Sequence, residues 1–105
     1  MKLNKCIKII GDNYKIQKFT SSHYFFAPGP MYNATDFITL HIKEQGGRVV
    51  LTDCGLAREH SDLKECDVKT LCERYGFEYE NGNVLKEFES LKDVENIIEL
   101  IETIC

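Results

Sequence analysis

The chain has 105 residues, 43% of them hydrophobic and 29% charged, and its net charge is −4. Apolar residues recur throughout and prolines number only two, so the composition fits a single folded domain over residues 1–105 and excludes a disordered chain. No apolar run approaches the roughly 18 residues of a membrane span. Lysines interrupt the apolar residues at the start of the chain, where a signal peptide would have its apolar core. We therefore expect a cytoplasmic protein without a membrane partner.

The first half of the chain predicts mainly strands. Residues 3–10 fit either a strand or a short helix, residues 14–19 begin with the alternation of a half-buried strand, and residues 20–35 are expected to be irregular. Residues 36–43 alternate as a strand does, and one face is wholly aliphatic and should be buried: Ile38, Leu40 and Ile42. Glycines 46 and 47 then predict a hairpin turn into a return strand over residues 48–53.

The second half predicts helices around a hairpin. Asp67 is expected to cap a helix that buries Cys72 and ends at Gly76. Residues 81–83, Asn-Gly-Asn, predict a tight turn between two short strands. Ser90 is expected to cap a last helix with one apolar stripe: Leu91, Val94, Ile97, Ile98, Ile101 and Ile104. The expected fold is therefore α+β, a mostly antiparallel sheet covered by about two helices in a single domain.

Charge is unevenly distributed along the chain. Residues 1–56 carry seven basic and four acidic side chains, a net charge of +3, whereas residues 57–105 carry six basic and thirteen acidic ones, a net charge of −7. Because nucleic-acid affinity depends largely on clustered Lys and Arg, we expect no direct binding to nucleic acid. An acidic half can steer association with a basic protein surface, and it can equally serve only to keep a small protein soluble.

The five cysteines do not follow the spacing of a zinc module or a disulfide scaffold. Their number is odd and no Cys-x-x-Cys pair occurs, so we expect reduced thiols, no metal ion and no cofactor. Cys54 lies in a tight turn and is expected to be accessible. The histidines His23, His41 and His60 are 18 and 19 residues apart, and no spacing pairs one of them with a thiol or a metal. We expect His41 to be an ordinary sheet residue.

Two pieces of the sequence resemble a known family. One is the strand over residues 36–42, which begins with an aspartate, and the other is the strand end over residues 50–55. Together, over about residues 19–60, they resemble a bacterial and prophage domain of unknown function, DUF eighteen twenty-eight, whose second strand ends in Leu-Thr-Asp-Asp-Gly. Cys54 stands where that family has its second aspartate, and the matching residues are Asp36, Leu51, Thr52, Asp53 and Gly55. The resemblance implies a phage or mobile-element origin and a role in conflict between phage and host.

Asp36 and Asp53 form the first candidate site. Asp36 begins one strand of a hairpin and Asp53 ends its partner, so both carboxylates are expected at the same end of the sheet, where they could share a divalent ion. The structural alternative is that Asp53 caps the turn through backbone N–H groups, with Gly55 supplying a positive φ.

The segment 23–33 is the second candidate site. It holds five large side chains around two prolines: Tyr24, Phe25, Phe26, Met31 and Tyr32. Aromatic and Met side chains are enriched at interfaces, and prolines lower the entropy cost of ordering a loop. The alternative is a segment that crosses the core with Phe25 and Phe26 buried.

These features favour a small, non-enzymatic interaction module that binds and inhibits a host protein. The concrete version is an anti-CRISPR-like inhibitor of a nucleic-acid-handling defence complex, in which Glu95, Glu99 and Glu102 compete for a basic groove. One alternative is a small-ligand or nucleotide-binding protein that stacks a base on the segment 23–33. The other is a metal-dependent hydrolase at Asp36 and Asp53. A homodimer through the last helix's apolar stripe or an edge strand is compatible with all three.

Overall fold

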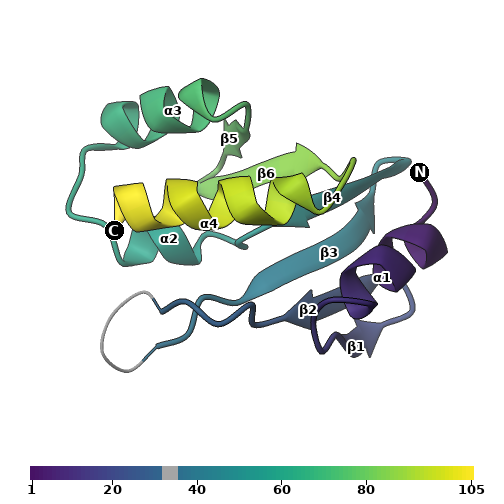
Figure 1. Cartoon of the computed structure of the whole chain (residues 1–105). Coiled ribbons are helices and arrows are strands. Elements are labelled where there is room, and N and C mark those ends of the chain that lie inside the picture. Colours follow the sequence, from purple (N-terminus) through teal and green to yellow (C-terminus); the bar gives the residue numbers. More distant parts are fainter. Residues whose placement is uncertain (32–35) are drawn as a thin grey trace.

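The structure is a computed structural model that describes residues 1–31 and 36–105. Its strands form one six-stranded antiparallel sheet in the order β1-β2-β3-β4-β6-β5 (Figure 1). The expected α+β fold is therefore confirmed. In chain order the elements are α1 (Leu3–Gly11), β1 (Gln17–Thr20), β2 (His23–Phe26), β3 (Leu40–Gln45), β4 (Arg48–Thr52), α2 (Leu56–Glu59), α3 (Glu65–Arg74), β5 (Glu78–Glu80), β6 (Asn83–Glu87) and α4 (Lys92–Ile104).

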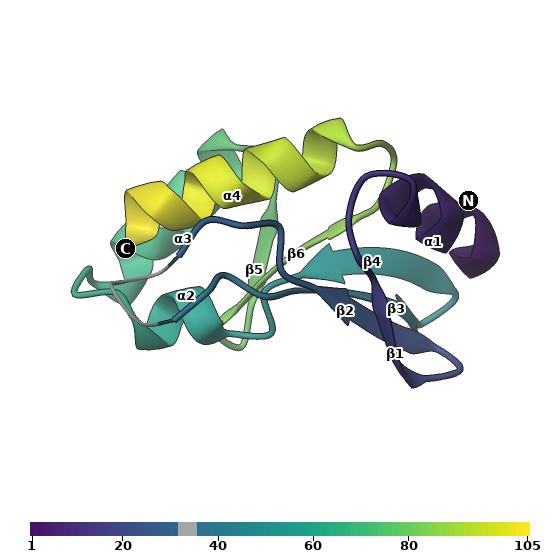
Figure 2. The same cartoon turned by 60° about the horizontal axis from the view of Figure 1, so that its bottom comes forward.

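Helices cover one face of the sheet. In both views α1 and α4 lie on the same side of the strands (Figures 1 and 2). The aliphatic face predicted for residues 36–43 points toward them, and Ile38, Leu40 and Ile42 are each 0% exposed. Leu51 lies opposite Ile42 and is equally buried. The opposite face of the sheet has no helix over it in the described part of the chain, and we call it the open face.

The N-terminal segment is a helix. Leu3, Cys6 and Ile10 are buried and recur at helical spacing, which places them on one face against the core. The short strand that residues 3–10 also allowed is absent. After α1 the chain forms β1, whose four residues are all exposed at the edge of the sheet.

The expectation that residues 20–35 are irregular is wrong at residues 23–26. This segment is β2, and it lies inside the sheet between β1 and β3. Its residues pair with β3 from His23, opposite Lys43, to Phe26, opposite Leu40. Proline is excluded from inner strands, but Pro28 lies two residues beyond the end of β2 and so does not interrupt the pairing.

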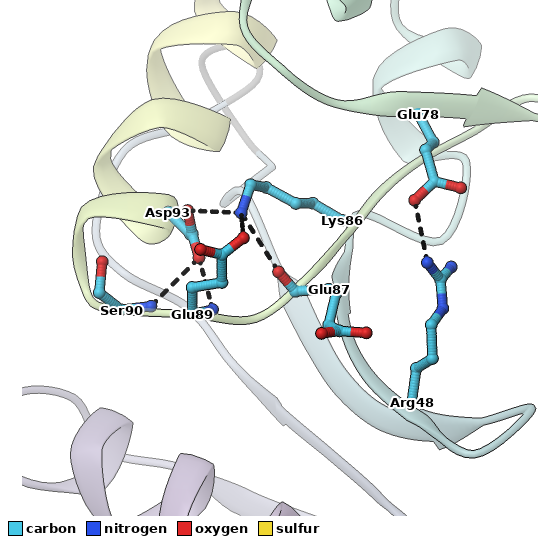
Figure 3. Close-up of polar contacts among 7 residues, drawn as sticks. All are labelled: Arg48, Glu78, Lys86, Glu87, Glu89, Ser90 and Asp93. Carbon is cyan, nitrogen blue, oxygen red and sulfur yellow. Dashed lines mark hydrogen bonds and ion pairs between the residues drawn. The ribbon is translucent and has the colours of Figure 1, made fainter. Parts of the chain in front are cut away.

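Both predicted helix caps are wrong. α3 begins at Glu65 after Lys64, so Asp67 lies in its first turn, where a carboxylate still stabilises the positive end of the helix. Ser90 makes no side-chain cap for α4. Instead the carboxylate of Asp93 reaches back and accepts hydrogen bonds from the backbone N–H groups of Glu89, at 2.7 Å, and Ser90, at 3.2 Å (Figure 3).

Lys86 completes this network at the start of α4. Its ammonium group lies 3.2 Å from a carboxylate oxygen of Asp93 and 2.9 Å from one of Glu89 (Figure 3). Asp93 is 5% exposed, so these partners, and not water, stabilise its negative charge. In the same view Arg48 and Glu78 form a separate, more exposed ion pair at 3.3 Å. The network fixes the turn that joins β6 to α4.

We expect Asp93→Ala to lower the free energy of unfolding by about 2 kcal/mol. It leaves two backbone donors without their acceptor and removes one of the two anions beside Lys86. The matched control is Glu89→Gln, because the Glu89 side chain is 72% exposed and its removal should cost less than about 0.5 kcal/mol. Urea unfolding of both variants measures the difference, and equal losses would contradict the assignment.

The apolar stripe of α4 packs against the sheet. Its most buried residues are at most 3% exposed: Val94, Ile97, Leu100, Ile101 and Ile104. Leu100 is not among the residues predicted for this stripe, and the predicted Leu91 and Ile98 are only half-buried. This face is therefore buried within the chain and is not available for the homodimer contact considered from the sequence. The other route considered, pairing through an edge strand, is still open at β1 and β5. Among the described residues, no helix combines the length and the apolar character required to cross a bilayer.

Candidate functional site

Asp53 is a structural residue of the turn after β4. One of its carboxylate oxygens accepts the N–H groups of Gly55 and Val84, both at 3.0 Å, and the other accepts the N–H of Ala57 at 2.9 Å. The side chain is 0% exposed, and burial raises the pKa of this carboxyl while the three N–H groups oppose that shift. Gly55 has a φ of 85°, as the turn requires. The turn-capping interpretation is confirmed.

Asp36 lies apart from this turn network. Its side chain is 57% exposed, and one carboxylate oxygen lies 3.4 Å from Nε2 of His60. The other ring nitrogen of His60 lies 2.9 Å from the carbonyl oxygen of Leu56, and these two acceptors raise the pKa of the imidazole, the carbonyl more than the carboxylate. Since the oxygens of Asp53 are occupied by backbone donors, the geometry offers no shared metal site for the two aspartates.

The aromatic residues of the segment 23–33 are dispersed. Tyr24 and Phe26 point toward the core, because alternate residues of β2 face opposite sides. Phe26 is 1% exposed, and its ring centroid lies 5.3 Å from that of Tyr14. Phe25 lies half-buried on the open face. Tyr32 lies outside the described residues. Core burial is thus confirmed for Phe26, and the described residues form no continuous stacking platform for a base.

Met31 remains available at the surface. It forms an isolated antiparallel bridge with Phe37, so the two side chains lie on the same side of the paired backbones. Met31 is 38% exposed and Phe37 is 57% exposed, which makes them an apolar pair open to a partner. Asp36 directly precedes Phe37 and contacts His60. The next residue, Ser61, donates its hydroxyl to the carbonyl of Ile104 at 2.8 Å. These contacts place the pair at the same end of the molecule as the C-terminal end of α4.

The open face brings His23, His41 and Cys54 together. Nε2 of His23 and Nδ1 of His41 lie 2.8 Å apart, with one hydrogen shared between them. Including the Cys54 sulfur, one ligand atom from each of the three residues lies within 4.8 Å of the others. All three side chains are half-buried. We call these residues the His–His–Cys cluster.

Each member comes from a different segment. His23 begins β2 and His41 lies in β3, where it faces Phe25 on one side and Thr52 on the other. Cys54 follows β4 in a left-handed conformation with a φ of 54°, which is uncommon for a residue other than glycine. Its N–H donates to the Thr52 hydroxyl at 3.1 Å, which holds the turn in this shape.

The electrostatics of the cluster keep both imidazoles neutral at pH 7. Burial lowers the pKa of His41 to about 4, with smaller contributions from His23 and the Lys43 cation. Burial and Lys43 also lower the pKa of His23. Burial raises the pKa of the Cys54 thiol, and Lys43 partly opposes this shift. Neutral imidazoles are the form in which histidine binds metal ions.

A polar hollow of about 140 Å³ is lined by residues of the open face, and the three cluster residues are not among them. Lys43 and Thr52 belong to its wall and neighbour His23 and His41 across the strands. The full wall is formed by Lys43, Gln45, Val50, Thr52, Glu80, Asn81, Asn83 and Leu85. The hollow is large enough for a few water molecules or a small polar group beside the cluster.

The acidic residues predicted to contact a partner share one face of α4. Glu95, Glu99 and Glu102 are exposed and follow one another at intervals of four and three residues, which places them on one stripe of the helix. Lys92 lies 3.7 Å from Glu95, whereas Glu99 and Glu102 have no ion pair with a described residue. We call these three glutamates the acidic stripe.

The comparisons with known proteins returned no relative: no family model matches the chain, and no curated protein or solved structure is significantly similar to it. The resemblance based on residues 36–42 and 50–55 stays a prediction.

Proposed function

We propose that this protein is a small, non-enzymatic binding module that inhibits a host protein by occupying a basic surface. The acidic stripe of α4 is its docking surface on this proposal. The basic surface is one that handles nucleic acid, so that the three carboxylates take the place of phosphates, as in an anti-CRISPR-like inhibitor.

The observation that carries the proposal is the charge of Glu99 and Glu102, which form no ion pair with a described basic residue, whereas Glu95 lies 3.7 Å from Lys92. Glu99 and Glu102 lie in the C-terminal half of α4, where the partial negative charge of the helix end disfavours acidic side chains. No basic residue lies in the last turn of α4 to offset them. An arrangement that opposes local helix stability is more often found at functional surfaces than elsewhere.

An apolar anchor accompanies this charge. Met31 and Phe37 are exposed at the same end of the molecule as the end of α4. Charged residues at an interface mainly govern the association rate, and buried apolar or aromatic residues govern its lifetime. The Met31–Phe37 pair supplies that second contribution, in place of the five-residue loop expected from the sequence.

Reversing the charge of the stripe is expected to weaken partner binding tenfold to a hundredfold. The triple variant is Glu95→Lys, Glu99→Lys and Glu102→Lys, and lysines near the end of a helix favour its folding. The tagged protein is incubated with an extract of its host, the enriched partner is identified by mass spectrometry, and its affinity is then measured by biolayer interferometry.

The matched control reverses three exposed glutamates elsewhere: Glu44, Glu80 and Glu87. This variant has the same net charge as the first, and it should retain affinity within about threefold. Equal losses for both triple variants would show that total charge governs binding and would refute α4 as the docking surface. The absence of any enriched partner with the wild-type protein would refute the binding module.

A further inference from the structure

We propose that the His–His–Cys cluster binds one divalent transition metal ion, with Zn²⁺ as its ordinary occupant. The site lies on the open face, on the side of the sheet away from α4. It is independent of the docking surface, and either assignment can fail without the other.

The distances fit a metal ion after a small adjustment. Zinc lies about 2.0–2.1 Å from histidine nitrogen and about 2.3 Å from cysteine sulfur, so tetrahedral geometry needs about 3.3 Å between the two nitrogens and about 3.5 Å from each nitrogen to the sulfur. The nitrogens of His23 and His41 are 2.8 Å apart, and the three ligand atoms lie within 4.8 Å of one another. The two nitrogens must therefore separate by about 0.5 Å, and the Cys54 sulfur must approach them by at most about 1.3 Å. Rotation of the three side chains can supply movements of this size.

The donor types select the class of metal. Two imidazole nitrogens and a thiolate suit borderline-soft ions such as Zn²⁺, Co²⁺ and Cu²⁺, whereas Mg²⁺ and Ca²⁺ prefer oxygen ligands. Three protein ligands leave a fourth position open, as catalytic or exchangeable zinc sites do. A water molecule fills that position on this proposal.

Metal binding at the cluster involves proton transfers and no oxidation or reduction. The Cys54 thiol releases its proton to solvent as the sulfur–metal bond forms. The hydrogen now shared between His23 and His41 moves to the outer nitrogen of the ring that carries it, through a change of tautomer, so that both facing nitrogens present lone pairs. The site gains a dipositive ion and loses one proton.

The turn that presents Cys54 supports a ligand role for its thiol. The residue adopts a positive φ without being glycine, and the Thr52 hydroxyl holds its backbone there. Strained conformations of this kind concentrate at functional sites. Cys66 and Cys105 provide a contrast, because they are exposed and lie outside the cluster.

The test uses Co²⁺, whose spectrum reports its ligands. Untagged wild-type protein, treated with chelator and then titrated with Co²⁺, is expected to bind one equivalent with a thiolate charge-transfer band in the near ultraviolet and intense visible bands of a tetrahedral site. Zn²⁺ should displace the cobalt and abolish both the charge-transfer band and the visible bands. Cys54→Ser should remove the charge-transfer band, and His41→Gln should weaken binding at least tenfold.

Matched controls are His60→Gln and Cys66→Ser, which change a histidine and a cysteine outside the cluster and should leave the spectrum unchanged. If Cys54→Ser fails to fold, His23→Gln replaces it, and NMR of the wild-type protein with Zn²⁺ provides a second measurement. The largest amide shifts should then fall at His23, His41 and Cys54. The absence of a thiolate band with Co²⁺, or a band that survives Cys54→Ser, would overturn the site.

Discussion

Replacing Asp53 with alanine is expected to lower the free energy of unfolding by about 3–5 kcal/mol. The carboxylate is 0% exposed and accepts three backbone N–H groups, from Gly55, Ala57 and Val84. Alanine leaves those donors buried without an acceptor, and water cannot reach them at low cost. Because the bond to Val84 joins the turn to β6, the substitution should loosen the sheet as well as the turn.

Two further variants separate this effect from a general loss of charge. Asp53→Asn keeps one acceptor oxygen but places an amide donor against a backbone N–H, so we expect about half of the loss. Asp36→Ala removes an aspartate whose side chain is 57% exposed, and it should cost less than about 1 kcal/mol. Urea unfolding followed by circular dichroism measures all three. A loss below about 1 kcal/mol for Asp53→Ala would contradict the structural role.

Replacing Phe26 with alanine is expected to cost about 3–5 kcal/mol, because it opens a cavity in the core. The side chain is 1% exposed and its ring packs against Tyr14. Phe37→Ala is the matched control: the same atoms are removed from a side chain that is 57% exposed, and the loss should stay below about 0.5 kcal/mol.

For partner binding, Phe37→Ala is the substitution that should have an effect, although its cost in stability is small. Phe37→Ala removes the proposed anchor and should weaken the complex about tenfold, since hot-spot truncations cost more than about 1 kcal/mol. Phe19→Ala, at an exposed phenylalanine of β1, controls for loss of surface apolar area. Unfolding by urea and affinity by biolayer interferometry measure the two effects separately. A stable Phe26→Ala variant would contradict the core assignment.

Local signals predicted much of the fold. Gly46 and Gly47 have the positive φ angles that a tight hairpin needs, and so do Asn81 and Gly82. Both predicted hairpins are found at these turns. The apolar stripe of α4 was equally readable, because burial of a helix follows a period of 3.6 residues. These features depend on a few adjacent residues and little else.

The missed elements depend on longer-range contacts. β2 has four residues, too few for an alternating pattern to stand out, and its neighbour β3 begins fourteen residues after it ends. The helix caps failed because Asp93 reaches backward to residues before α4, which a search for Ser or Asp at the first position does not detect. Boundaries of this kind are decided by tertiary contacts more than by propensity.

The His–His–Cys cluster could not be found from spacing alone. His23 and His41 are neighbours only because β2 pairs with β3, and Cys54 joins them only because β4 ends beside His41. The feature that could have revealed the cluster is the register of pairing between β2 and β3. Once residues 23–26 are taken as a strand opposite residues 40–43, the two histidines fall on the same face of the sheet, one diagonal step apart.

Native mass spectrometry of a mixture of the captured partner, its nucleic acid and this protein tests whether the protein displaces nucleic acid from its partner. We expect a complex of the partner with this protein and without nucleic acid. We also expect that the triple variant at Glu95, Glu99 and Glu102 leaves the nucleic acid in place. A ternary complex of all three components, or displacement of nucleic acid by the triple variant as efficient as by the wild-type protein, would contradict the proposed function.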